Sequence, residues 1–114
     1  MNEQELLDKY SAKTSSFRLD TFVPLRGDTF VHKDAAGNSY ELILSSVEQQ
    51  TRDSDMFDNF TLVLASARNT RFPQGYFLLE HESLGEFPLF LVPTVSRDPD
   101  QSSYCVYFSL KKDR

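Results

Sequence analysis

Few residues of this chain are of the types that usually perform catalysis or bind metals. The sequence holds one cysteine, Cys105, and two histidines, His32 and His81. A cysteine nucleophile needs a nearby base and an electropositive environment that favours its thiolate. Cys105 instead lies between Tyr104 and Val106, with no second cysteine and no histidine close to it in the sequence. We therefore expect Cys105 to be a small buried residue of a strand rather than a nucleophile.

Metal binding is the second chemistry that these residues suggest. With a single cysteine, a structural zinc site needs carboxylates to complete its ligand set. Glu80 and Glu82 flank His81 in the sequence. Neighbouring side chains of a strand point to opposite faces, however, so these three residues do not converge on one ion. We expect His81 to lie at the end of a turn and to hydrogen-bond the backbone.

A group of carboxylates at Asp53, Asp55 and Asp58 has the ligand type that calcium prefers. A calcium loop also needs a glycine at its bend and a bidentate acid further along, and neither is present at the required offset. A solvated loop is the favoured interpretation. The sequence also lacks a glycine-rich phosphate loop, a G-x-S-x-G elbow and an H-E-x-x-H motif. We expect no catalytic residue, no metal and no cofactor, and predict that the chain is not an enzyme.

Composition limits the kind of protein that carries these residues. The chain has 114 residues, of which 39% are hydrophobic and 25% charged, as in one globular domain. Ten Phe and five Tyr favour strands with an aromatic core. A net charge of −5 argues against a nucleic-acid partner. No apolar run is long enough for a membrane helix, the first residues are too acidic for a secretory signal, and the lone cysteine suits a reducing cytoplasm.

The order of apolar and polar residues predicts the elements. Leu6, Leu7 and Tyr10 have the spacing of a short amphipathic helix over residues 2–12, which a polar connector over 11–16 follows. From Phe17 onward the pattern is that of short strands between polar or glycine-containing turns. The predicted extended segments are residues 21–23, 29–32, 40–47, 60–67, 76–79, 87–92 and 104–110.

Two loops and one strand have distinctive sequences. In the loop over residues 34–38, we expect Gly37 and Asn38 to adopt positive φ. In residues 40–47 the apolar parity shifts along the strand, which indicates either a bulge or cover on both faces. Residues 50–58 form the longest predicted loop of the first half.

These elements define an all-β fold: a small antiparallel β-barrel or tight sandwich of about six strands with a short N-terminal helix. We assign residues 1–16 to the helix and connector, and residues 17–114 to a single barrel domain, and expect helix only before about residue 16. Residues 72–93 hold two strands that are apolar on both faces, so they belong at the centre of the structure. The predicted core residues are Tyr76, Leu78, Leu89, Leu91 and Phe108. A ligand-holding barrel would be lined by Phe60, Leu62, Tyr76, Leu78 and Phe108.

Several short motifs of this chain resemble a known family. They comprise an F-x-P-L-x-G-x-x-F stretch from Phe22 to Phe30, and later Pro73-Gln74-Gly75-Tyr76, Leu79-Glu80-His81, Leu84-Gly85 and Leu89-Phe90-Leu91-Val92-Pro93. Their order is similar to that of a small bacterial domain family of unknown function with a P-Q-G-x-Y-x-L-E-H…L-G-x-x-x-L-F-L-V-P core. The resemblance covers residues 17–109, and the chain departs from it at Ser83, where the family commonly has proline. It implies a small β-domain without assigned activity and, because members often neighbour phage tail-collar-like proteins, a place in a phage-tail-like assembly.

Two functions compete at this point. The first is a structural or protein-interaction module that binds another chain, either a second copy or an assembly partner. The apolar excess in residues 87–92 favours it, since a small barrel buries only one face of a strand. The second is a small barrel that binds an apolar ligand, with or without catalysis. About six strands leave an interior that side chains mostly fill, which disfavours the second function.

The candidate protein-contact residues are Phe57, Arg71, Phe72 and Phe90. Phe57 and Phe72 are large aromatic residues in otherwise polar loops, and Arg71 beside Phe72 has the composition of an interface hot spot. Phe90 is predicted to face away from the core. The competing interpretation is that the loop aromatics fold back and plug the ends of the barrel.

Overall fold

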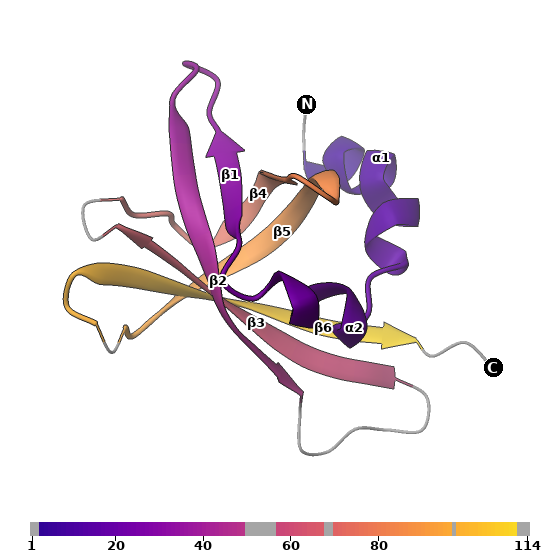
Figure 1. The fold of residues 1–114 in the computed structure, drawn as a ribbon. Helices are drawn as coiled ribbons and strands as arrows, with labels where there is room; N and C mark the ends of the chain where they lie inside the picture. The colour runs from indigo at the N-terminus through magenta and orange to yellow at the C-terminus, as the bar shows by residue number, and fades with distance from the viewer. Residues whose placement is uncertain (1–2, 50–56, 68–69, 97, 112–114) are drawn as a thin grey trace.

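The structure is a computed structural model that describes residues 3–49, 57–67, 70–96 and 98–111, with the backbone alone at 57–58 and 109–111. Two helices and a 3₁₀ turn precede six strands (Figure 1). Their bounds are α1 Glu3–Ser15, α2 Leu19–Phe22, η1 Val23–Leu25, β1 Thr29–Lys33, β2 Ser39–Gln49, β3 Phe57–Ala67, β4 Gly75–His81, β5 Gly85–Thr94 and β6 Gln101–Lys111.

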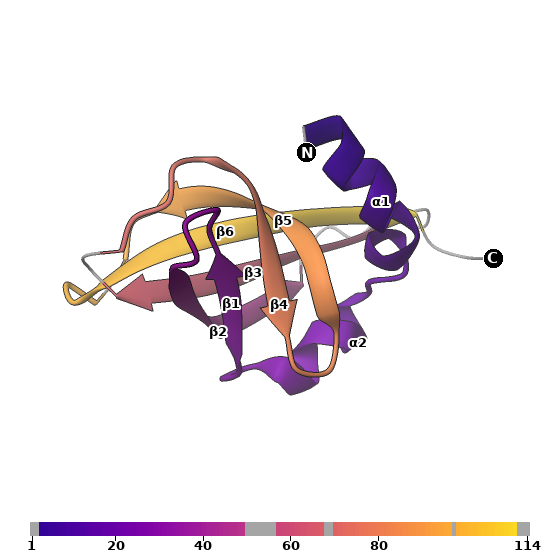
Figure 2. The same cartoon turned by 90° about the horizontal axis from the view of Figure 1, so that it is seen from above.

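The six strands close into an antiparallel barrel in the order β1-β2-β3-β6-β5-β4. β4 then pairs with β1 and completes the circle. The predicted fold class is therefore confirmed, and of its two versions the barrel is the observed one. The longest ladder joins β3 to β6 over 57–67, whereas β1 and β4 are joined only at Val31–Glu80 and His32–Leu79. The strands lie around a common interior, and α1 lies outside it against β5 (Figure 2).

Phenylalanine and leucine side chains from all six strands fill the barrel. Leu89 and Leu91 are buried as predicted, and the half-buried Phe108 packs against the same cluster. Tyr76 and Leu78 were assigned to the wrong face, because Phe77, Leu79 and His81 are the side chains of β4 that face inward. β4 is apolar on both faces, and with a side-chain period of two a one-residue error in parity exchanges the faces. The largest fully buried members of the core are Tyr104, Phe22, Phe30, Leu42, Leu44, Phe60, Leu62, Leu64, Leu79, Phe87 and Leu91.

The structure of β2 confirms one of two expectations left open by the sequence, and the turn before it corrects another. The register between β2 and β3 shifts between Leu44 and Ser46, so the change of parity along β2 is a β-bulge. In the β1–β2 turn, Gly37 has φ +89° as predicted, but no described residue other than glycine has a positive φ, so Asn38 does not. The side chain of Asp34 stabilises the turn instead, because its Oδ1 accepts hydrogen bonds from the backbone N–H groups of Ala36 and Asn38, both at 2.9 Å.

The N-terminal region is more helical than the sequence pattern predicts. α1 continues to Ser15, so most of the expected connector is helix. The serine and threonine residues of this segment are compatible with the helix because their hydroxyl groups donate to carbonyls three or four residues earlier. Thr14 Oγ1, for example, donates to Tyr10 O at 3.1 Å. Residues 21–23 were predicted to be extended and are instead the end of α2 and the start of η1. Arg18 N–H donates to Thr21 Oγ1 at 3.0 Å, which fixes the start of α2, and Phe22 is buried beneath it.

Phe17 and Phe22 fill a gap in the barrel wall. β5 and β6 pair only over Val92–Thr94 and Ser103–Cys105, so the first part of β5 has no ladder to β6. The ring of Phe17 lies 5.1 Å from that of Phe87 on β5 and 6.5 Å from that of Phe108 on β6. Phe22 continues the contact, 5.5 Å from Phe108. The residues between α1 and β1 are therefore part of the core.

Candidate functional site

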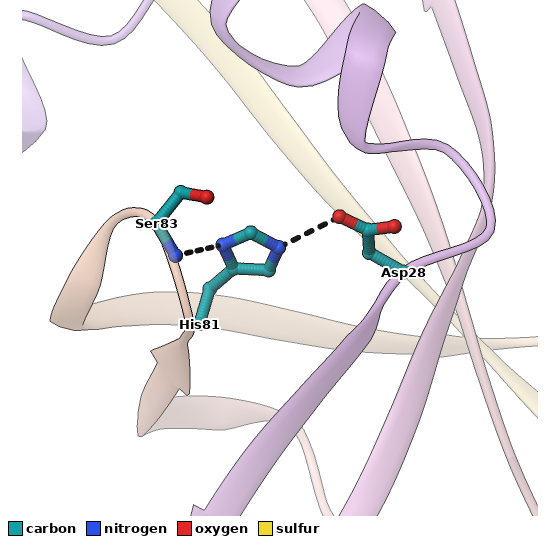
Figure 3. A network of polar contacts seen from close by, with 3 residues as sticks. All are labelled: Asp28, His81 and Ser83. Carbon is teal, nitrogen blue, oxygen red and sulfur yellow. Dashed lines mark hydrogen bonds and ion pairs between the residues drawn. The ribbon is translucent and has the colours of Figure 1, made fainter.

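His81 has the residue type and environment that most resemble a catalytic group. It ends β4, is 4% exposed and packs against the Phe30 ring at 4.8 Å. Its Nε2 lies 2.9 Å from Asp28 Oδ2, and its Nδ1 lies 3.0 Å from the backbone nitrogen of Ser83 (Figure 3). The bond to Ser83 confirms that His81 is a turn-end histidine bound to the backbone. Sequence reasoning missed Asp28, which lies just before β1 and far from His81 in the chain.

The two hydrogen bonds of His81 occupy both ring nitrogens. A backbone N–H can only donate, so Nδ1 accepts from Ser83 and the ring proton is on Nε2, which donates to Asp28. A general base needs a free lone pair directed at a substrate, and this imidazole has none. Glu80 and Glu82 are exposed to solvent. The arrangement is a clamp between the start of β1 and the β4–β5 turn.

His32 has a similar role at the other end of the short β1–β4 ladder. Its Nδ1 lies 2.9 Å from the carbonyl oxygen of Leu78, so the ring donates a hydrogen bond from β1 to the backbone of β4. The two histidines therefore join, through side chains, the two strands that share the fewest backbone pairs in the barrel.

Cys105 and the acidic residues give no assembled site. Cys105 is half-buried on the outer face of β6, since Tyr104 and Val106 are the inward neighbours, and this corrects the expectation of a buried cysteine. A hydrogen bond with Cys105, and its charge, raise the pKa of the neighbouring Tyr107 above 10.0. Asp53 and Asp55 lie outside the described residues, as does the side chain of Asp58. Within the described part of the chain, no three histidine, cysteine or acidic side chains gather as metal ligands.

A cleft of about 350 Å³ opens at the end of the barrel where β4 begins. It is lined by His32, Tyr40, Thr70, Arg71, Phe72 and Phe77. Phe72 is the centre of this group: its ring lies 5.7 Å from His32, 5.7 Å from Tyr40 and 5.1 Å from Phe77.

The backbone at this end is fixed by Tyr104. Phe72 N–H donates to the hydroxyl of Tyr104 at 2.9 Å, and that hydroxyl donates to the carbonyl of Thr70 at 3.3 Å. Both bonds hold the segment that precedes β4 onto β6. Arg71, between the two anchored residues, is exposed. We call the cleft and its six lining residues the Arg71 cleft.

The four predicted contact residues have different positions in the structure. Phe72 is 7% exposed and plugs the end of the barrel, as the competing interpretation expects, and only part of its ring reaches the cleft. Arg71 is exposed beside it. Phe90 faces outward as predicted and is half-buried against Tyr76, with ring centroids 4.8 Å apart. Phe57 is the first residue of β3 rather than part of a loop, and its side chain lies outside the described residues.

Sequence reasoning missed three rings of the cleft, those of His32, Tyr40 and Phe77. His32 and Tyr40 are directly opposite each other in the β1–β2 ladder, and their rings stack at 6.2 Å. The loop between them is short enough to have predicted that pairing. Phe77 was hidden by the wrong parity of β4. No helix among the described residues has the length and apolar character that crossing a membrane requires.

The fold and this site define a class of protein: a closed, six-stranded antiparallel barrel with a filled interior, a helix packed on its outside and an aromatic cleft at one end. The chain belongs to the family described as a domain of unknown function (DUF6916), whose model matches residues 17–108. This agrees with the resemblance to a small domain family of unknown function. Searches of curated proteins and of solved structures found no match to the chain.

Proposed function

We propose that this chain is a non-enzymatic protein-interaction module, which binds a partner chain at the Arg71 cleft. The observation that carries the proposal is the exposed Arg71 directly beside four contacting rings, of which Phe72 is anchored by Tyr104. Arginine and aromatic residues are enriched at interface hot spots. An aromatic floor that is already rigid also loses little conformational entropy when a partner binds.

The engagement of His81 supports a non-enzymatic role, because both of its ring nitrogens are hydrogen-bonded within the protein. His32 contributes structurally through Nδ1, which donates to the backbone of β4. The packed barrel interior likewise favours a surface function over a ligand inside the barrel. The partner is either a second copy of the chain or a different protein. The resemblance to a family that neighbours phage tail-collar-like proteins favours a phage-tail-like assembly as the setting.

Charge reversal at Arg71 tests the proposal. Arg71→Glu should abolish partner binding while the fold, followed by circular dichroism and thermal melting, is retained because the side chain is exposed. Arg26→Glu is the matched control, since Arg26 is also exposed but lies before β1, outside the cleft. Cross-linking in the native cells identifies partners, and binding is then measured with the purified chains together with light scattering for self-association.

The expected result is an association that Arg71→Glu removes and Arg26→Glu preserves. If neither self-association nor binding of a purified partner depends on Arg71, the proposed interface is wrong. An activity of the purified chain on a small molecule, lost on replacing a cleft residue, would contradict the non-enzymatic role.

A further inference from the structure

We infer that the Arg71 cleft binds a peptide segment of the partner in which an acidic residue stands next to an aromatic one. The inference rests on the proposed function and adds the chemistry of the partner. It follows from three observations: an available cation in the cleft, an aromatic floor, and a carboxylate bonded to the hydroxyl of one lining residue, Tyr40.

Arg71 is the cation. Among the described residues it has no ion-pair partner, whereas two lysines are engaged: Lys33 pairs with Glu80 at 4.0 Å, and Lys13 donates to the carbonyls of Leu84 and Glu86 at 3.0 Å. An arginine guanidinium presents parallel N–H donors that match a carboxylate and bind it in a bidentate manner. In a chain with net charge −5, an exposed cation in a cleft also marks where an acidic partner can approach.

The rings provide the apolar part of the site. His32, Tyr40 and Phe77 are half-buried around the buried Phe72, so each presents part of its ring to the cleft. Aromatic rings favour edge-to-face contacts with one another, and these four already adopt several. A volume of about 350 Å³ is at the small end of ligand sites, which suits one or two side chains rather than a folded domain.

Asp34 does not line the cleft, but the hydroxyl of Tyr40, which does, donates to it at 3.1 Å, so its charge favours one orientation of the ligand. Its carboxylate accepts hydrogen bonds from the Ala36 and Asn38 N–H groups, the Asn38 side chain and the Tyr40 hydroxyl. These bonds, that from the Asn38 backbone first, lower its pKa, so it is ionised at neutral pH. An acidic ligand group is repelled from the Tyr40 side and attracted to the Arg71 side. The aromatic side chain of the ligand therefore lies towards His32 and Tyr40.

Three blocked dipeptides test this chemistry. Acetyl-Phe-Glu-amide carries both groups, acetyl-Phe-Gln-amide lacks the charge, and acetyl-Ala-Glu-amide lacks the ring. Binding is followed by amide chemical shifts in the isotope-labelled full chain, and by the same titrations on Arg71→Gln and on the control Arg26→Gln. We expect acetyl-Phe-Glu-amide to shift amides of residues 32, 40 and 70–77, and to bind about tenfold more tightly than either other dipeptide.

Arg71→Gln should remove the preference for Glu over Gln, and Arg26→Gln should keep it. Equal binding of the Glu and Gln dipeptides, shifts confined to another face, or no shifts would each overturn the inference. If a purified partner requires Arg71 but no dipeptide binds, this inference fails and the proposed function stands. If acetyl-Phe-Glu-amide binds in the cleft but no partner depends on Arg71, the chemistry of the cleft is supported and the proposed function fails.

Discussion

The imidazole of His81 exchanges two bonds to water for two bonds within the protein and adds ring contact with Phe30. Replacing it with alanine leaves Ser83 N–H without its acceptor and opens a space beside Phe30. Loss of a partly buried hydrogen bond and of a packed side chain each cost about 1–3 kcal/mol. His81→Ala should therefore lower the free energy of unfolding by about 2–4 kcal/mol, measured by urea denaturation.

The control for His81 is Glu82→Ala, an exposed neighbour that should change stability by less than about 0.5 kcal/mol. If both variants unfold at the same urea concentration as the wild type, His81 is not a structural clamp. In that case a functional role for the His81–Asp28 pair deserves direct measurement.

Asp34 gives a prediction about pH. Hydrogen bonds lower the pKa of the Asp34 carboxyl below 3.8 in the folded chain, and the bond from the Asn38 backbone has the largest effect. A carboxyl whose folded pKa is depressed contributes stability that is present above the unfolded value and is lost as the pH falls through the folded value. Asp34→Asn should therefore be less stable than the wild type at neutral pH, and the difference should shrink below pH 3.8.

Urea denaturation of both proteins across this range measures the effect. A stability difference that stays constant from neutral pH into strong acid would show that the charge of Asp34 does not stabilise the turn.

At the scale of elements, α1 and the residues that follow it differ in how much they contribute to the stability of the barrel. α1 has no buried residue, and its Lys13 donates to the carbonyls of Leu84 and Glu86. Phe17, two residues after α1, is 3% exposed and closes the gap between β5 and β6. Phe17→Ala should destabilise the chain by about 3–5 kcal/mol, whereas Tyr10→Ala on α1 should cost clearly less.

Thermal and urea unfolding of these two variants, and of the chain without residues 1–15, make the comparison. The shortened chain should keep the circular dichroism of a β-barrel. If removing α1 unfolds the protein while Phe17→Ala does not, the helix rather than the Phe17 contact holds the barrel closed.

The sequence predicted those elements whose periodicity is unambiguous. In β3 the largest apolar residues, Phe60, Leu62 and Leu64, alternate along the strand, and they were placed on the correct inner face. α2 and η1 could not be predicted, because Thr21, Phe22 and Val23 favour strands, and burial of Phe22 against Phe60 and Phe108 overrides that preference.

The candidate site was predictable only in part, since it depends on contacts between distant segments. Arg71 and Phe72 were selected as a pair from their composition. Phe72 rather than Arg71 is buried, and the Phe72 backbone is held in place by Tyr104. The Tyr104 hydroxyl accepts the Phe72 N–H, although the two residues are 32 positions apart in the chain. No local pattern encodes that bond. The same applies to Asp28, just before β1, and His81, at the end of β4, which meet only when the barrel closes.

At the scale of the whole molecule, the closed barrel determines what its interior can do. Rings and leucine side chains from every strand meet inside, and Phe87 contacts both Phe17 and Phe30. Protein interiors packed in this way have few voids larger than a water molecule. The interior is therefore expected to stabilise the fold rather than to hold a ligand.

Benzene tests that expectation, with Phe87→Ala as the matched positive control. The wild-type melting temperature should not change with added benzene. Phe87→Ala removes a fully buried ring, so it should lose about 3–5 kcal/mol of stability and leave a dry apolar cavity of the kind that binds benzene. Benzene should raise the melting temperature of this variant alone, because a ligand that binds only the folded state stabilises it. A comparable rise for the wild type would reveal an internal ligand site and restore the ligand-binding barrel as a function.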